Sequence, residues 1–241
     1  MRWHLKIMEI NKIHLGDYLQ LISGLPKVDM ILCDPPYLYE KGGNSKVFKG
    51  EALHRESRTM LNSEFGEDKI FEFLNTTKTL MEKPQWYLFC SEKQLGFYLD
   101  WANKNKFLFN VLVWCKPLSI LNRNRYSTNL EYIVRIYNWG VPLNDLEQSK
   151  NKYYSKCKVY NSIRGNDKLH PQQKPIDLLK EIIEISTKEG DLILDTFMGS
   201  GSTAIACKET NRNFIGFEID NENYNKANKR INEWKPDLLL F

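Results

Sequence analysis

The sequence lacks any long run of apolar residues. None of its stretches approaches the roughly 20 apolar residues that a helix needs to cross a bilayer. The first residues, 1–11, include Arg2, Lys6 and Glu9, and they do not form the apolar segment of a secretory signal. We therefore expect neither a membrane anchor nor export, and we predict a cytoplasmic protein.

Cysteine is scarce and irregularly spaced. The five residues show neither the C-x-x-C spacing of metal sites nor the even count of a disulfide framework. Three of them end apolar runs, where a thiol is usually a small core residue. We expect free thiols in a reducing compartment, no disulfide and no metal site. The cysteines are Cys33, Cys90, Cys115, Cys157 and Cys207.

Charge of one sign is in small excess, with a net charge of +4, but its distribution is uneven. Between residues 116 and 168 there are ten Lys or Arg residues and four Asp or Glu residues, interleaved with seven Tyr or Trp residues. Cations mixed with aromatic rings suit the backbone and the stacked bases of a nucleic acid. A solvated basic face is the alternative interpretation.

What the sequence does contain is an alternation of apolar strands and amphipathic helices. Hydrophobic residues make up 42% of the chain and aromatic residues 12%, enough for a large core. The alternation predicts an α/β fold with a doubly wound, mostly parallel sheet, and 241 residues fit one such domain with a small insertion. The expected strands are 12–15, 28–33, 86–90, 107–115, 131–137, 191–195 and 214–218, and the expected helices are 18–25, 68–81, 95–103, 176–186, 203–209 and 221–234.

Two segments interrupt this alternation. Residues 38–66 are polar, contain Gly42 and Gly43 and show little periodicity, so we expect a long mobile loop. Loops of this length inside compact domains are usually lids or binding segments. Residues 138–168 show no clean period either, and we expect an inserted recognition segment there.

Asp34-Pro35-Pro36-Tyr37 follows directly on an expected apolar strand. Proline cannot donate a backbone hydrogen bond, and the residue before each proline is held extended. A carboxylate, a stiff turn with free carbonyl groups and an aromatic ring therefore stand at the carboxyl end of a strand. Ligands bind at that edge of open α/β sheets. By itself, the tetrapeptide indicates either a solvated turn or a functional site.

A glycine turn links another expected strand to an expected helix. Gly199, Gly201 and Ala204 satisfy the pattern G-x-G-x-x-G/A, and Glu218 ends the next strand 17 residues after Gly201. Taken literally, this is the fingerprint of a dinucleotide-binding enzyme, such as an NAD-dependent oxidoreductase. Its physical basis is more general, because glycines let any ligand approach the backbone and the acid can bind any ribose.

Asp195 bears on the choice of cofactor. It lies at the tip of the strand, two residues before Phe197. A carboxylate there disfavours a pyrophosphate and favours a cofactor with a positively charged amino-acid end. S-adenosylmethionine carries an ammonium and a sulfonium at that end, so the turn favours the methyl donor over a nicotinamide cofactor.

The two motifs together resemble those of the amino-group DNA methyltransferases, which share a D-P-P-Y motif and an F-x-G-x-G motif. Here the D-P-P-Y motif comes first, a variable segment second and the glycine motif last, with His170-Pro171-Gln172-Gln173-Lys174-Pro175 ahead of the glycine motif. This order is similar to the beta group of the family. The resemblance implies the S-adenosylmethionine-dependent methyltransferase fold in a circularly permuted form. It divides the domain into a catalytic part (1–137), a target-recognition segment (138–168) and a cofactor-binding part (169–241).

The resemblance also implies roles for the residues of the first motif. The Asp34 carboxylate and the Pro35 carbonyl accept hydrogen bonds from the target amine, and Tyr37 stacks on the flipped base. Pro36 is the remaining residue of this catalytic motif. Holding both amine protons favours a pyramidal nitrogen whose lone pair can attack a methyl group in line. Extruding the base costs a few kcal/mol, and stacking on Tyr37 offsets roughly 1–3 kcal/mol of that cost.

Other residues match the family's cofactor site. Asp195 faces the methionyl end, Glu218 binds the ribose hydroxyls, and Asp17 contacts the adenine ring. The remaining matches are Phe197, Gly199, Ser200 and Gly201, which border the cofactor, and His170 and Lys174, near its methionine carboxylate.

These expectations combine into a site-specific DNA methyltransferase that modifies the N6 amine of a flipped-out adenine. Aspartate at the first motif position favours adenine N6 by resemblance only, and cytosine N4 is the first alternative. An RNA methyltransferase and an NAD-dependent oxidoreductase are the further alternatives. Double-stranded DNA is the expected partner, and the family suggests a cognate restriction endonuclease and a homodimer. The candidate DNA contacts, chiefly to phosphate, are Arg123, Arg125 and Arg164.

Overall fold

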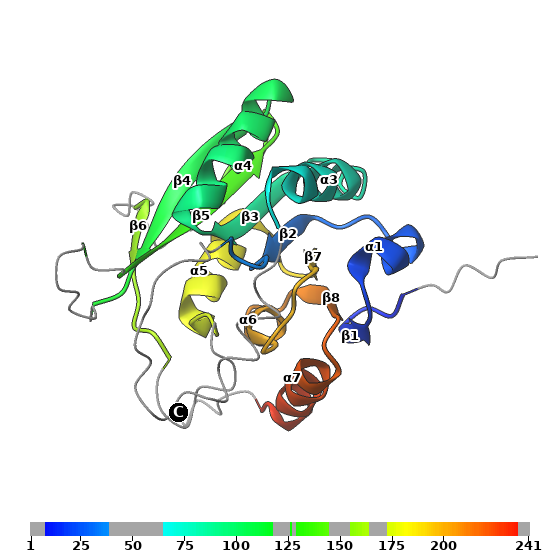
Figure 1. The fold of residues 1–241 in the computed structure, drawn as a ribbon. Helices are drawn as coiled ribbons and strands as arrows, with labels where there is room; N and C mark the ends of the chain where they lie inside the picture. Colours follow the sequence, from blue (N-terminus) through cyan, green and yellow to red (C-terminus); the bar gives the residue numbers. More distant parts are fainter. Residues whose placement is uncertain are drawn as a thin grey trace, which may run out of the picture.

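The computed structural model describes residues 8–38, 65–117, 126, 129–144, 155–163 and 173–235. Its strands are β1 (Lys12–Leu15), β2 (Met30–Cys33), β3 (Gln85–Cys90), β4 (Leu108–Cys115), β5 (Leu130–Tyr137), β6 (Cys157–Val159), β7 (Leu192–Asp195) and β8 (Asn213–Glu218). They form one sheet in the order β1-β8-β7-β2-β3-β5-β4-β6 (Figure 1).

Each face of this sheet carries its own set of helices. The helices are α1 (Tyr18–Leu21), the 3₁₀ helix η1 (Ile22–Gly24), α3 (Glu67–Lys78), α4 (Glu92–Lys104), α5 (Ile176–Ser186), α6 (Ser202–Glu209) and α7 (Asn221–Glu233). One core packs α1, α3 and α4 against strand residues such as Ile31, and the other packs α5, α6 and α7 against residues such as Leu32. Successive side chains of a strand point to opposite faces, so these two neighbours enter different cores.

Helix α5 illustrates why the chain folds in this way. Leu178, Leu179, Ile182 and Ile183 recur at helical spacing, and all four are buried against the sheet. Burying each of these side chains contributes about 1.5–3 kcal/mol. The apolar stripe therefore fixes the position of α5, and with it the position of the residues just before the helix.

The sheet is mostly parallel, as the sequence predicts. Only β5, among the described strands, runs antiparallel to its neighbours, β3 and β4. Tyr132, near the start of β5, pairs with Cys90 at the end of β3. The start of β5 therefore lies at the edge of the sheet where the parallel strands end.

The point where the chain reverses its direction of winding lies between β2 and β7. From β2 the chain continues to β3 on one side, whereas from β7 it continues to β8 on the other. Ligands of open α/β sheets bind outside the carboxyl ends of the strands at such a point. Those ends carry Asp34 and Asp195.

The structure differs from the sequence-based expectations in two elements. The helix expected at 18–25 is one short α-helix followed by η1. The segment 138–168 contains β6, which pairs in parallel with β4 and which we did not expect. Three residues are too few to show a strand period, so only pairing with a neighbour reveals this strand. Of the loop expected at 38–66, residues 39–64 lie outside the described residues.

None of the helices in the described part of the chain is long and apolar enough to cross a membrane. All five cysteines are free thiols, and the Sγ atoms of Cys115 and Cys157 lie 3.0 Å apart on β4 and β6.

Candidate active site

The turn at residues 34–37, called the prolyl turn below, follows β2 and is fastened to α4 by one side chain. Gln94 is fully buried, and its Nε2 donates to the Pro36 carbonyl at 2.9 Å and to the Phe65 carbonyl at 3.0 Å. Its Oε1 accepts hydrogen bonds from the amide and hydroxyl groups of Ser91. Because both ends of the Gln94 amide are bonded, the turn has a fixed orientation relative to the start of α4.

A buried lysine lies against this turn. Lys174 is 5% exposed, and its Nζ lies 2.6 Å from Asp34 Oδ2, 3.1 Å from Glu131 Oε2 and 3.2 Å from the Tyr37 hydroxyl. It precedes Pro175, the N-cap of α5, and a residue before proline is held extended. Burial by itself lowers the pKa of an ammonium, but the two carboxylates outweigh it and raise the pKa of Lys174. Lys174 is therefore a charged partner of Asp34 at neutral pH.

Glu131, near the start of β5, connects this lysine to a second one. Its Oε2 accepts the Tyr37 hydroxyl at 2.9 Å as well as the Lys174 ammonium, and its Oε1 lies 2.5 Å from Lys116 Nζ. Although burial opposes ionisation, the two ammonium groups lower the pKa of Glu131 to about 2. Lys116, Glu131, Lys174 and Asp34 thus form a row of alternating charges, called the charge cluster below.

The two oxygens of Asp34 have different surroundings. Oδ2 accepts the Lys174 ammonium, whereas Oδ1 is buried and has no hydrogen-bond partner among the described residues. Burial raises the pKa of Asp34, and the Lys174 ammonium opposes that rise. A buried acceptor left without a donor costs about 1–3 kcal/mol. Oδ1 is therefore placed to accept a hydrogen bond from a ligand.

Residues 195–201, called the glycine loop below, leave β7 beside the prolyl turn. Gly199 and Gly201 have left-handed backbone angles, with φ of 52° and 76°, which glycine adopts at little cost. A Cβ atom on Gly201 would lie 3.3 Å from the Cβ of Ala227 in α7, so glycine also permits this close packing. The Gly199 amide donates to Glu218 Oε2 at 2.7 Å, which fastens the loop to the end of β8.

Asp195 is a buried carboxylate that forms no ion pair with any residue the structure describes. Its Oδ1 accepts the Phe197 amide at 2.9 Å. Burial, together with the charges of Asp34 and Glu218, raises the pKa of Asp195 to about 7. A positive group beside these carboxylates would favour their ionised forms. This edge of the sheet therefore suits a cationic ligand.

Asp17 and Phe197 lie near the same edge. Asp17 caps α1 by accepting a backbone amide at 3.0 Å, and the Gly16 amide donates to the Glu218 carbonyl at 2.9 Å. The Phe197 ring packs edge-on against Tyr18, with 5.4 Å between the ring centroids. The start of α1 and the glycine loop therefore flank the end of β8.

Comparison with known proteins places this geometry in a family. Residues 28–229 match the family model N6_N4_Mtase, described as DNA methylase. The chain belongs to this DNA methylase family. It is 31% identical over 225 residues to the Type II methyltransferase M2.DpnII of Streptococcus pneumoniae, covering 85% of this chain and 82% of that protein. It is 28% identical over 247 residues to the Type II methyltransferase M2.MboI of Moraxella bovis, covering 94% and 89%.

Solved structures resemble this DNA methylase as well. The M1.HpyAVI–SAM complex has a TM-score of 0.68 and 26% identity, covering 91% of this chain and 98% of that one. The PvuII DNA methyltransferase, described as cytosine-N4-specific, has a TM-score of 0.72 and 16% identity, covering 92% and 87%. At such low identity, the second likeness concerns the fold alone. The expected family and methyltransferase fold are confirmed.

In this DNA methylase the prolyl turn and the glycine loop meet at one edge of the sheet, as their positions after strands predict. Lys174, which we expected near a cofactor carboxylate, contacts Asp34. The Ser200 carbonyl accepts Arg230 of α7 at 3.0 Å, and its hydroxyl lies 3.1 Å from that of Ser202 at the start of α6.

Sequence reasoning missed Gln94, Lys116 and Glu131. The sequence does offer a hint that Glu131 and Lys116 belong to a site, because each is a charged residue at the boundary of an expected strand. The sequence does not show that β5 runs antiparallel, which is what brings Glu131 to the edge where β3 ends. Gln94 has no signal of its own in the sequence.

Some expectations fall on residues outside the described part of the chain, namely His170, Arg123, Arg125 and Arg164. Among the residues that are described, no group of three or more His, Cys, Asp or Glu side chains could hold a metal ion.

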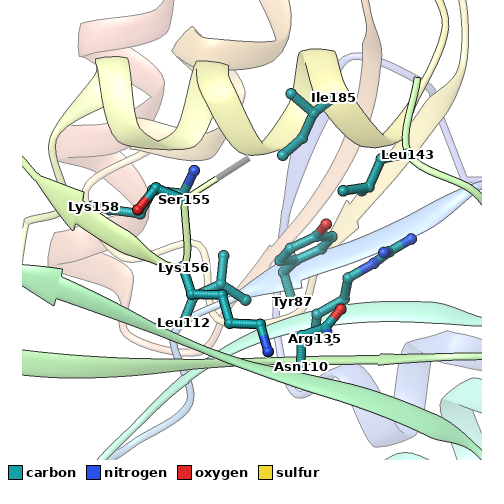
Figure 2. A pocket seen from close by; sticks show the side chains of 9 residues that line it. All are labelled: Tyr87, Asn110, Leu112, Arg135, Leu143, Ser155, Lys156, Lys158 and Ile185. Carbon is teal, nitrogen blue, oxygen red and sulfur yellow. The ribbon is translucent and has the colours of Figure 1, made fainter. Parts of the chain in front are cut away.

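Side chains that include Tyr87, Leu143 and Ile185 line a pocket of about 70 Å³ (Figure 2). Its lining includes Arg135 of β5, which donates to the Val141 carbonyl at 3.1 Å and stacks 4.0 Å from the centre of the Tyr137 ring. No residue of the prolyl turn or the glycine loop lines it. This pocket is therefore separate from the candidate active site, which we place at the carboxyl ends of β2 and β7.

Proposed function

We propose that this DNA methylase transfers a methyl group from S-adenosylmethionine to the N6 amine of adenine in double-stranded DNA. The observation that carries the proposal is the asymmetry of Asp34. One oxygen of this carboxylate is held by Lys174, and the other is buried with no partner among the described residues. An amine that donates one hydrogen bond to Asp34 matches that arrangement.

The chain's own residues prepare the amine for reaction. The lone pair of an exocyclic base amine is delocalised into the ring, which makes the nitrogen a poor nucleophile. Asp34 Oδ1 accepts one amine proton, and the Pro35 carbonyl accepts the other. Both bonds localise the lone pair on nitrogen. Fixing the reacting atoms at ~3–3.5 Å then supplies much of the acceleration.

Lys174 keeps the acceptor in its ionised form. Burial raises the pKa of Asp34, so without a cation beside it the carboxyl group would gain a proton more readily. A protonated carboxyl group is a weaker acceptor for the target amine. The ammonium at 2.6 Å opposes that protonation and holds Oδ2, which leaves Oδ1 to the substrate.

The other half of the site suits the cofactor. S-adenosylmethionine supplies a methyl group on a positively charged sulfur. Asp195 faces its cationic end. Burial and neighbouring carboxylates raise the pKa of Asp195 to about 7, and a positive group beside it would favour the ionised form. Glu218 would bind the ribose, Asp17 the adenine ring, and Phe197 and Gly199 would border the cofactor.

The base must leave the duplex to reach this edge, at a cost of a few kcal/mol. Tyr37 is our candidate for the stacking partner. Tyr37 is 6% exposed and its hydroxyl is bonded to Glu131. The side chains that cover the ring therefore have to move before a base can stack on it. Stacking on an aromatic ring contributes roughly 1–3 kcal/mol.

The choice of adenine over cytosine rests on the aspartate of the prolyl turn. N4 of cytosine remains the alternative, because both amines offer the same two protons to Asp34 and Pro35. We further propose a cytoplasmic restriction–modification role with a cognate endonuclease, and a homodimer, as the resemblance to the family implies.

The test is methylation of DNA that lacks modified bases. Purified protein is incubated with such DNA and S-adenosylmethionine, and the product is sequenced with detection of modified bases. We expect N6-methyladenine at one recurring sequence. N4-methylcytosine would overturn the base assignment, and methylation of RNA but not of DNA would overturn the substrate. Absence of methyl transfer to either polymer would overturn the proposed function.

A further inference from the structure

Glu131 lies on a different strand from both motifs, yet it contacts two groups that surround Asp34. It accepts the Lys174 ammonium at 3.1 Å and the Tyr37 hydroxyl at 2.9 Å on the same oxygen. Its second oxygen is taken by Lys116 at 2.5 Å. None of these contacts is made with the target amine, so any effect of Glu131 on methyl transfer must pass through its neighbours.

The ammonium of Lys174 carries three N–H donors on a flexible stem. Asp34 Oδ2, Glu131 Oε2 and the Tyr37 oxygen are three of its contacts, at 2.6, 3.1 and 3.2 Å. The Tyr37 hydroxyl donates its own proton to Glu131, so its oxygen can accept from the lysine. Glu131 therefore sets both where the ammonium lies and how the hydroxyl is oriented.

Removing this anchor changes what the lysine does to Asp34. An ammonium that has Asp34 as its main counter-charge can move between the two carboxylate oxygens, which share the negative charge equally. At Oδ1 it would occupy the acceptor that the proposed mechanism reserves for the target amine. The second carboxylate pulls the ammonium to the Oδ2 side, where the structure finds it.

The balance of charges also indicates that Lys174 needs Glu131 as a second counter-charge. The charge cluster contains two ammonium groups, Lys116 and Lys174, and two carboxylates, Glu131 and Asp34. Lys174 is buried and the other three side chains are mostly shielded from solvent. In such surroundings a charge that loses its partner destabilises the fold. Lys116 contacts Oε1 of Glu131, the oxygen that does not contact Lys174, and so restrains the orientation of the carboxylate.

We propose that Glu131 is a positioning residue, which holds Lys174 against Oδ2 of Asp34 and so keeps Oδ1 open for the target amine. This inference rests on the proposed function, and it assigns to β5 a part in methyl transfer that neither motif contains. It also gives Lys116 a role, as the residue that orients Glu131.

The test is Glu131→Gln, which keeps the shape of the side chain and removes its charge. We expect the single-turnover rate of methyl transfer to fall about 10–100-fold, as for a small misplacement of a catalytic group. The dissociation constants for S-adenosylmethionine and for DNA should stay within about threefold of wild type, since Glu131 is expected to contact neither. Equal losses of binding and rate would indicate a merely structural role and overturn the proposal.

Glu181 offers a matched control. It too accepts a buried lysine and a tyrosine hydroxyl, Lys158 at 2.5 Å and Tyr160 at 2.6 Å, but these partners belong to β6 and the residues after it rather than to the prolyl turn. Glu181→Gln should lower the melting temperature about as much as Glu131→Gln does, because each removes one charge from a comparable set of contacts. It should leave the single-turnover rate unchanged. A comparable loss of rate in both variants would show that the effect is not specific to Glu131.

A double-mutant cycle with Lys174→Met tests whether Glu131 acts through the lysine. We expect Glu131→Gln to change the rate less than about twofold once Lys174 is absent, because coupled residues are not additive. Additive effects would overturn the proposal. If Glu131→Gln fails to fold, Glu131→Asp replaces it in the same cycle. Its shorter side chain cannot span Lys116 and Lys174 together, and an unchanged rate would overturn the proposal.

These outcomes are separate from those for the proposed function. If wild type methylates DNA and Asp34→Ala does not, but Glu131→Gln behaves as wild type, the positioning role alone is wrong. If wild type transfers no methyl group, the proposed function itself is wrong.

Discussion

The ammonium of Lys174 lies 2.6 Å from one oxygen of Asp34, 140 residues away in the sequence, and the other oxygen of that carboxylate is buried without a partner among the described residues. The prolyl turn supplies the carboxylate, and the start of α5 supplies the cation that keeps it ionised. An ionised acceptor with one oxygen left over fits a hydrogen-bond donor such as an amine, and it repels a phosphate or another anion.

Asp34→Ala removes the acceptor for the target amine. We expect the rate of methyl transfer to fall by at least about 10²–10³-fold, the usual cost of losing one positioned hydrogen-bonding group at a reacting centre. Binding of S-adenosylmethionine, measured by calorimetry, should remain largely intact because Asp195 is untouched. Methyl transfer at nearly the wild-type rate would show that Asp34 has another role.

Lys174→Met changes the pH dependence of methyl transfer. Burial raises the pKa of Asp34 and Lys174 opposes that rise, so removing the ammonium raises the pKa of Asp34 further. Activity needs the ionised carboxylate, and the acid limb of the single-turnover rate should therefore move to higher pH. The other titratable groups that influence or face Asp34 are Glu131, Tyr37, Cys33, Cys90, Tyr98 and Asp195.

Lys180→Met is the control for this experiment. Lys180 is also on α5, but it pairs with Glu209 at 2.9 Å, away from the prolyl turn. The acid limb of the single-turnover rate of Lys180→Met should coincide with that of wild type. A shift of the limb to lower pH in Lys174→Met would contradict the assigned role of the lysine.

Binding of S-adenosylmethionine should weaken as pH falls below 7. Burial raises the pKa of Asp195 to about 7 in the unliganded protein, and only its ionised form attracts the cationic cofactor. The dissociation constant should rise by up to about tenfold per pH unit below that value. Asp195→Asn should bind weakly at every pH. A constant affinity between pH 6 and pH 8 in wild type would exclude the assignment.

The same substitution should stabilise the unliganded protein at alkaline pH. Because the folded-state pKa of Asp195 lies above its ordinary value, the folded protein holds a proton that the unfolded chain loses between about pH 4 and 7. Stability from this group is thus lost as pH rises through that window. Asp195→Asn avoids the loss, and thermal unfolding at pH 8 should show a higher melting temperature than wild type.

Gly201→Ala tests the glycine loop. Its φ of 76° is strained for alanine, and the new Cβ would lie 3.3 Å from Ala227. We expect a loss of about 1–2 kcal/mol from the backbone strain alone, with weaker cofactor binding. Gly140→Ala is the control, because Gly140 has a similar φ of 84° and nothing within 4 Å of an added Cβ. It should show the strain but bind the cofactor normally in a fluorescence titration.

Much of the site was accessible from the sequence because its parts are local. A strand that ends at two prolines, and a strand that turns through glycines into a helix, fix their own backbone over fewer than about ten residues. Helix α5 could also be predicted from the sequence, since its apolar residues recur at helical spacing. Strand β6 was not, because three residues show no period and pairing with β4 defines them.

By itself, the sequence determined the alternation of elements, the two motifs and the carboxylates that stand after their strands, because short-range backbone preferences and hydrophobic period settle these. The tertiary structure decided which side chains meet. Lys174 contacts Asp34 because α5 packs beneath the sheet, and Glu131 joins them because β5 runs antiparallel and begins where β3 ends. Contacts between residues so distant in the chain depend on strand order and direction, which no local pattern records.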